Sequence, residues 1–113
     1  MTNLVEAAQA AARAIDEKFG KDILVLDIKT LSSVADYFII ATAGNVNQMA
    51  AMADAAEEAL IKNGINIRHA EGQKNSNWLL LDFGDIVLHI FDEEGRQFYN
   101  LERIWGDAAS IEF

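Results

Sequence analysis

Two segments of the chain carry apolar residues at the three- or four-residue spacing that places them on one side of a helix. Each segment is followed by a glycine, Gly20 or Gly64, a residue that commonly ends helices. Asn45 followed by Gln48 is typical of a helix start. The pattern predicts one helix over residues 3–19 and another between Asn45 and Gly64. The apolar stripes are Leu4, Ala8, Ala11, Ile15 and Phe19 in the first helix, and Met49, Met52, Ala53, Ala56 and Leu60 in the second.

Shorter apolar segments predict strands. Residues 23–28 and 37–42 are apolar without alternation, which is typical of strands buried on both faces beneath helices. A polar connection, residues 30–36, separates them. Residues 65–68 alternate like a half-exposed strand, and residues 71–77 are expected to form a polar loop.

The segment 78–91 predicts a β-hairpin. Gly84 and Asp85 form a two-residue turn with glycine first, as a type II′ turn prefers. This turn sets the strand register, and the register gives one face made only of large apolar side chains, which must therefore face a core. The pairs on that face are Phe83 with Ile86, Leu81 with Leu88, and Leu79 with Ile90.

The opposite face of the hairpin mixes aromatic, aliphatic and ionisable side chains. We expect Trp78, Leu80 and His89 to share this face and Trp78 to anchor a partner. His89 is expected to be a hydrogen-bonded group on a partly covered sheet face. Trp78→Ala should leave the monomer folded, because the all-apolar face is untouched. The mixed face consists of Trp78, Leu80 and Asp82 opposite Phe91, His89 and Val87.

The remaining segment completes a mixed α/β arrangement. Phe98, Leu101 and Trp105 are spaced for a short amphipathic helix, and a tail is expected from Asp107 onward. The element order αββαβββα predicts α/β architecture with a single mixed sheet and helices packed on it. The length, 113 residues, predicts one domain over residues 1–113.

Composition narrows the partner class. There are 18 acidic against 9 basic residues, a formal charge of −9, so direct nucleic-acid binding is not expected and a basic protein partner is favoured. The apolar runs are too short for a membrane span, and the first residues lack the pattern of a signal peptide, so a cytoplasmic protein is expected. One acidic stretch without Lys or Arg contains Asp82, Asp85, Asp92, Glu93 and Glu94.

Catalytic and metal-binding motifs find little support in the sequence. The helix start at residues 44–48 has one glycine and no following Lys-Ser or Lys-Thr, so it is not a P-loop. His69 and His89 lie on different predicted strands, and no cysteine could complete a zinc site. Asp82 and Asp85 could hold a divalent metal, although aspartate is also favoured at hairpin turns for its backbone geometry. We predict no catalytic residue, metal or cofactor.

Several segments together resemble the Iojap-like ribosomal silencing factors. The similarity extends from Asp27 to Ala108 and depends on spaced Trp, His and Tyr-x-Leu-Glu elements. The segments that carry it are Ala35–Thr42, Gln48–Asp54, Glu71–Gly72, Trp78–Asp82, Gly84–Phe91, Arg96–Glu102 and Trp105–Ala108.

The resemblance implies a translation repressor that binds the large ribosomal subunit. It implies docking on large-subunit ribosomal protein fourteen, a block on joining with the small subunit, a nucleotidyltransferase-like but non-catalytic fold, and a possible homodimer. A metal-dependent nucleotidyltransferase-like enzyme using Asp82 and Asp85 is the alternative, and a protein that only self-associates is a third possibility. The candidate partner-binding residues are Trp78, Leu80, Asp82, Asp85, His89, Asp92, Tyr99, Glu102 and Trp105.

Overall fold

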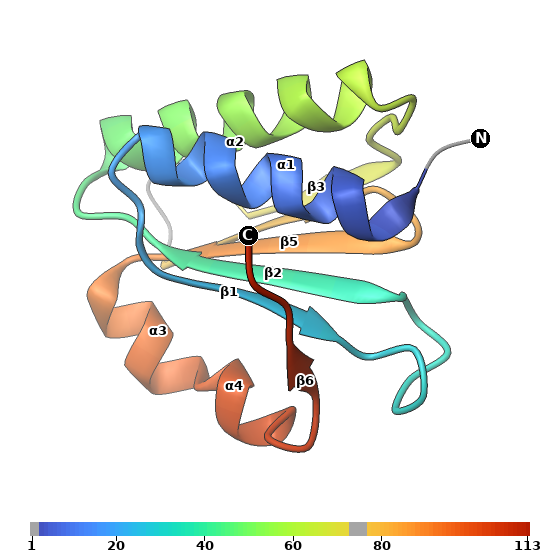
Figure 1. The fold of residues 1–113 in the computed structure, drawn as a ribbon. Helices are drawn as coiled ribbons and strands as arrows, with labels where there is room; N and C mark the ends of the chain where they lie inside the picture. Colours follow the sequence, from blue (N-terminus) through green and yellow to red (C-terminus); the bar gives the residue numbers. More distant parts are fainter. Residues whose placement is uncertain (1–2, 73–76) are drawn as a thin grey trace.

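The computed structural model describes residues 3–72 and 77–113, and these form a mixed sheet with helices on both faces (Figure 1). The strands are β1 (Lys21–Asp27), β2 (Tyr37–Thr42), β3 (His69–Glu71), β4 (Trp78–Asp82), β5 (Ile86–Phe91) and β6 (Ala109–Ser110). Within the described residues they lie in the order β3-β4-β5-β2-β1-β6. The central pair, β2 and β5, is parallel, and its neighbours pair antiparallel. The predicted mixed α/β architecture is confirmed.

Two long helices cover one face of the sheet: α1 (Leu4–Glu17) and α2 (Val46–Lys62). Asn3 caps α1 through its side-chain oxygen, and the Asn45 side chain accepts from the Gln48 backbone N–H at 2.8 Å, which starts α2. Both predicted helices are confirmed. The buried side of α1 is mainly alanine, so α1 can pack closely against α2 and the sheet.

The other face is covered by two short helices, α3 (Glu93–Tyr99) and α4 (Leu101–Ile104). The prediction of one continuous helix is wrong here, because Asn100 adopts the left-handed conformation (φ 46°, ψ 53°) and separates the two. The predicted tail from Asp107 is also wrong. Residues 109–110 form β6 on the edge of β1, and the Ile111 side chain packs against the core beneath α1 and α2.

The predicted hairpin register is confirmed. Leu79 lies opposite Ile90 and Leu81 opposite Leu88, and the Phe83 N–H donates to the Ile86 carbonyl at 2.9 Å. Gly84 has a φ of 91°, which glycine adopts without steric cost. The all-apolar face packs beneath α1 and α2, in what we call the first core. The face carrying Trp78, Leu80 and His89 turns toward α3 and α4, and the apolar side chains buried there, among them Phe38 and Phe91, form the second core.

The edge strand β3 differs from its prediction. The strand forms at residues 69–71, and residues 65–68, predicted to be extended in the sheet, precede it as a connection. Ile65 and Ile67 pack half-buried against the first core, so their alternation reflects contact with the core and not strand pairing. The predicted polar loop over residues 71–77 lies partly outside the described residues.

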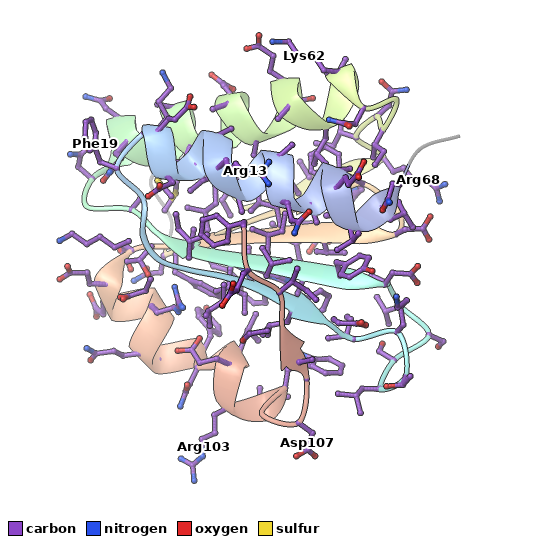
Figure 2. All side chains as sticks on the ribbon, viewed as in Figure 1. Arg13, Phe19, Lys62, Arg68, Arg103 and Asp107 are labelled. Carbon is purple, nitrogen blue, oxygen red and sulfur yellow. The ribbon has the colours of Figure 1, made fainter. Side chains whose placement is uncertain are left out.

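Side chains fill the space between the sheet and both helical layers, while charged groups such as Lys62, Arg103 and Asp107 project outward (Figure 2). The prediction that Phe19 belongs to the apolar stripe of the first helix is wrong: α1 ends at Glu17, and Phe19 follows it with a φ of 64° and a side chain that is 83% exposed and projects outward (Figure 2). Among the described residues, no helix is long and apolar enough to cross a membrane.

The register generates a stability prediction. Leu88 is fully buried in the first core, so Leu88→Ala should lower the free energy of unfolding by roughly 2–5 kcal/mol, since it removes apolar contacts and leaves a cavity. Leu80→Ala on the opposite face should cost clearly less, because Leu80 is half-buried. Urea denaturation of both variants measures the difference, and equal losses would contradict the assignment of the two faces.

Candidate functional site

A row of aromatic rings crosses the sheet face beneath α3 and α4. It starts at Trp105 in the cover and continues through Phe38 and His89 on the sheet to Trp78 and the exposed helix surface. Edge-to-face and stacked arrangements of this kind stabilise beyond the area they bury. The centroid distances are 5.3 Å for Trp105–Phe38, 4.7 Å for Phe38–His89, 5.8 Å for His89–Trp78, 4.6 Å for Trp78–Tyr99 and 5.0 Å for Tyr99–Phe98.

His89 and Trp78 also form a hydrogen bond within this row. The indole Nε1 of Trp78 donates to Nδ1 of His89 at 3.1 Å. His89 is 4% exposed, and burial lowers its pKa from 6.5 to about 4, so the imidazole is neutral at neutral pH. The expectation of a hydrogen-bonded histidine on a covered face is confirmed.

At its outer end the row borders a groove of about 280 Å³, which we call the Trp78 groove. Half-buried Trp78 and Leu80 and the exposed Tyr99 supply its apolar surface, and Glu71 supplies a carboxylate. Phe98 is 79% exposed beside Tyr99 and extends the apolar surface onto α3. The groove is lined by Glu71, Gly72, Asn77, Trp78, Leu80 and Tyr99.

The start of α3 is held against the start of β4. Asp92 caps the helix by accepting from the Gly95 N–H at 2.7 Å, and the Asn77 side chain donates to the same carboxylate at 3.3 Å. A side chain at Gly95 would collide with the Asn77 carbonyl, so glycine permits the close approach of helix and strand. Asp92 therefore has a structural role in placing α3 beside the groove.

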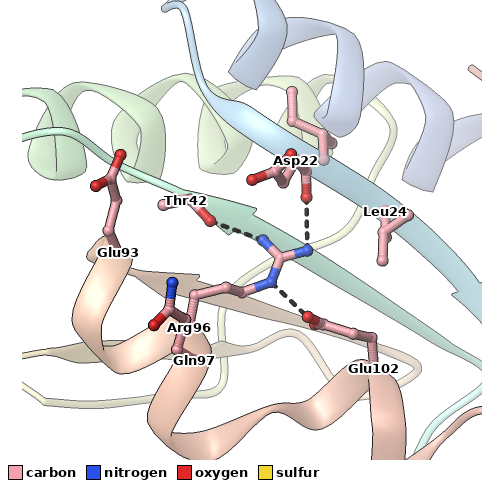
Figure 3. A pocket seen from close by; sticks show the side chains of 8 residues that line it. Asp22, Leu24, Thr42, Glu93, Arg96, Gln97 and Glu102 are labelled. Carbon is pink, nitrogen blue, oxygen red and sulfur yellow. Dashed lines mark hydrogen bonds and ion pairs between the residues drawn. The ribbon is translucent and has the colours of Figure 1, made fainter.

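A buried arginine holds the middle of this cover (Figure 3). The Arg96 guanidinium donates to Glu102 at 2.9 Å, to the Thr42 hydroxyl at 2.8 Å and to the Asp22 carbonyl at 2.7 Å. These bonds tie α3 to α4, β2 and β1 across the helix break at Asn100. A pocket of about 620 Å³ lies beside them, and its polar walls include Glu93, Gln97 and Glu102.

The structure brings together five of the predicted site residues. Trp78, Leu80, His89, Tyr99 and Trp105 belong to the aromatic row or pack beside it. The prediction that Trp78→Ala leaves the monomer folded stays a prediction. The indole packs on His89, Phe91 and Tyr99, so truncation also removes contacts from the second core, and a loss of stability is expected beside any loss of binding.

The predicted acidic site residues are dispersed. Asp82 and Asp85 lie at the hairpin turn, at the opposite end of β4 from Trp78. Asp82 accepts from the Gly84 N–H at 2.7 Å, a turn-forming contact, while Asp85 is exposed. Glu102 is engaged by Arg96. In residues 3–72 and 77–113, no group of three or more His, Cys, Asp or Glu side chains is placed to hold a metal ion.

Sequence reasoning missed Phe98, Arg96 and Glu71 as parts of this region. The helical spacing of Phe98 with Leu101 and Trp105 predicted one apolar face. The helix is interrupted at Asn100, and Phe98 is exposed. Arg96 lies in a segment that carries the family resemblance, but its role could not be derived, because its partners Thr42 and Asp22 are distant in sequence. Glu71 was expected in a loop.

The fold and the groove define a small α/β protein whose mixed sheet carries an aromatic-lined surface on the face covered by the short helices α3 and α4. A family model described as "Ribosomal silencing factor during starvation" matches residues 2–113. The chain therefore belongs to the ribosomal silencing factor family, and the resemblance found in its sequence is confirmed.

Individual relatives agree with this assignment. The chain is 42% identical to a ribosomal silencing factor of Bacillus subtilis over 105 residues, covering 91% of this chain and 89% of that protein. It is 40% identical to the chloroplastic Iojap protein of Arabidopsis thaliana over 97% of this chain and 45% of the plant protein. A Chromobacterium violaceum crystal structure, 33% identical, superposes with a TM-score of 0.86 over 92% of this chain and 87% of that chain.

The lowered pKa of His89 predicts an acid dependence of stability. The His89 imidazole binds a proton near pH 6.5 in the unfolded chain and only near pH 4 in the folded chain. The stability that depends on neutral His89 is therefore fully present above about pH 6.5 and is lost as the pH falls toward 4. Between about pH 7.5 and pH 5, the native protein should lose about 2 kcal/mol more unfolding free energy than His89→Phe. Urea denaturation at both pH values tests this, and parallel profiles would contradict it.

Proposed function

We propose that this protein represses translation by binding the large ribosomal subunit and blocking its joining with the small subunit. The observation that supports this best is the exposed apolar surface of Phe98, Tyr99 and the Trp78 groove in a chain that matches the silencing-factor family over residues 2–113. Its relatives are named for ribosomal silencing. The site of action is then the cytoplasm.

The chemistry of the surface favours a basic protein as the direct contact. The chain carries a formal charge of −9, and Glu71 lies in the groove wall while Glu93 and Glu94 are exposed at the start of α3. An apolar centre with an acidic rim suits a partner that presents an apolar anchor among Lys and Arg side chains. Large-subunit ribosomal protein fourteen, the partner implied by the family resemblance, is the candidate.

Repression by this route requires only that the protein occupies its binding surface on the large subunit, and it requires no chemical reaction. A protein bound at the subunit interface prevents the small subunit from approaching the same surface. The alternative, a metal-dependent nucleotidyltransferase-like enzyme, would depend on Asp82 and Asp85 at the hairpin turn. Asp82 is engaged there with the Gly84 backbone, which favours a turn role.

The decisive experiment has two parts. Purified protein is sedimented with isolated large and small subunits, and the joining of labelled subunits is then followed as protein is added. Selective sedimentation with large subunits and a dose-dependent loss of joining would support the proposal. Binding of nucleotide with magnesium, together with no ribosomal association, would overturn it in favour of the enzyme. Self-association without ribosomal binding would favour the third possibility, a protein that only forms homo-oligomers.

Phe98 offers a test of the apolar contact that does not disturb the fold. Its ring is 79% exposed, so Phe98→Ala should leave the free energy of unfolding within about 0.5 kcal/mol. If Phe98 is an anchor, the same change should weaken binding to large subunits by about tenfold or more. The control is Val34→Ala, 72% exposed and beyond the opposite end of the central strands. Equal affinities of the two variants would refute the assigned surface.

Charge reversal tests the acidic rim. Glu71→Lys places a positive charge in the groove wall and should slow association with the basic partner, and the native association rate should fall as salt is raised. Asp85→Lys makes the same charge change at the far end of β4 and should slow association less. Stopped-flow measurements with labelled large subunits compare them. A rate that is independent of salt would count against electrostatic steering.

A further inference from the structure

His89 is unusual among the residues of the central strands. Its neighbours along β5 are all aliphatic or aromatic hydrocarbons, and the strand is buried throughout. The Trp78 indole can only donate a hydrogen bond, so Nδ1 of His89 must be the acceptor at 3.1 Å and the ring proton must lie on Nε2. Nε2 is buried and has no hydrogen-bond partner among the described residues.

A buried N–H without an acceptor lowers stability. A phenylalanine at position 89 would keep a ring between Phe38 and Trp78 and would avoid this cost, because both neighbours are aromatic. The same substitution would remove the acceptor of the Trp78 Nε1–H, so the contact that histidine alone supplies in the second core is this bond. The property that phenylalanine lacks is the acceptor at Nδ1, which is directed at Trp78.

That acceptor controls the orientation of the indole. Trp78 lies between Tyr99 at 4.6 Å and Phe91 at 5.5 Å, and ring packing of this kind holds the plane of the indole. Stacking is much less sensitive to a turn of the ring within that space than a directional hydrogen bond is. The bond from Nε1 to His89 thus selects which edge of the indole borders the groove beside Leu80.

We propose that His89 is a positioning residue for partner binding: its Nδ1 fixes one orientation of the Trp78 indole, and the cost is a buried Nε2 N–H that has no acceptor among the described residues. The proposal rests on the function proposed above, in which the Trp78 groove receives the apolar anchor of a basic protein. Phenylalanine at position 89 then favours the stability of the fold, whereas histidine favours affinity for the partner.

Two substitutions separate those demands. His89→Phe keeps a ring but removes the acceptor. His89→Asn loses the ring but can present an amide oxygen near the position of Nδ1, so it should restore the bond to Trp78 at the expense of packing. Both are made in a Trp105→Phe background, which leaves Trp78 as the single indole, and this background protein is the reference.

The readouts are thermal unfolding, the indole N–H resonance of Trp78 and affinity for isolated large subunits. His89→Phe should unfold at a temperature equal to or above that of the reference, show a shifted or doubled indole resonance, and bind about tenfold more weakly. His89→Asn should unfold at a lower temperature, yet keep a single indole resonance near the reference position and bind more tightly than His89→Phe.

Two results would overturn the proposal. One is a reference-like indole resonance and affinity in His89→Phe, which would mean that Nδ1 does not position Trp78. The other is affinity that follows unfolding temperature through both variants, as a purely structural role requires. If the unsubstituted protein fails to bind large subunits, the proposed function fails, whereas the indole resonances still test whether His89 orients Trp78.

Discussion

The parallel pair of β2 and β5 is buried along its whole length on both faces, and this constraint organises the rest of the molecule. A strand pair with no exposed face needs a cover on each side. The first cover consists of two long helices with a large apolar contact. The second must be built from the 7 residues of α3 and the 4 residues of α4. Helices this short are not stable alone and depend on tertiary contacts.

The second cover is therefore held by specific side-chain bonds. Arg96 ties it to two strands, Asp92 starts it, and the aromatic row fills the space beneath it. Such a thin cover also leaves apolar side chains at its surface, because helices of 7 and 4 residues cannot bury all of their own apolar side chains against the sheet. The exposed rings of Phe98 and Tyr99 belong to this cover, so the surface proposed to bind a partner follows from the way the sheet is closed.

Local chemistry made the first cover and the hairpin predictable. Asn45 and Gly84 act within a few residues of their own positions, so the start of α2 and the hairpin register can be derived from neighbouring residues alone. The break at Asn100 could not be predicted in this way, because the left-handed conformation there accompanies the contact between Arg96 and Glu102. The pairing of β6 with β1 could not be predicted either, because it joins residues that are more than 80 positions apart in the sequence.

The candidate site was predictable only as far as the hairpin register reaches. The hairpin register placed Trp78, Leu80 and His89 on one face, and the mixed character of that face predicted that it is only partly covered. Burial of His89 required knowing that Phe38 and the C-terminal helices lie over it. Two of the predicted partner-binding residues, Asp92 and Glu102, make contacts that hold the cover, and the proposed contact surface lies beside them.

The two edges of the sheet differ from its centre. The edge strands β3 and β6 contain 3 and 2 residues, so each offers only a short length of its own backbone for another strand to join. Short edges are one way in which β-sheet proteins avoid sticking to one another edge to edge. Pairing of two copies through β3 or β6 would form few backbone hydrogen bonds, so association at these edges depends on side-chain complementarity.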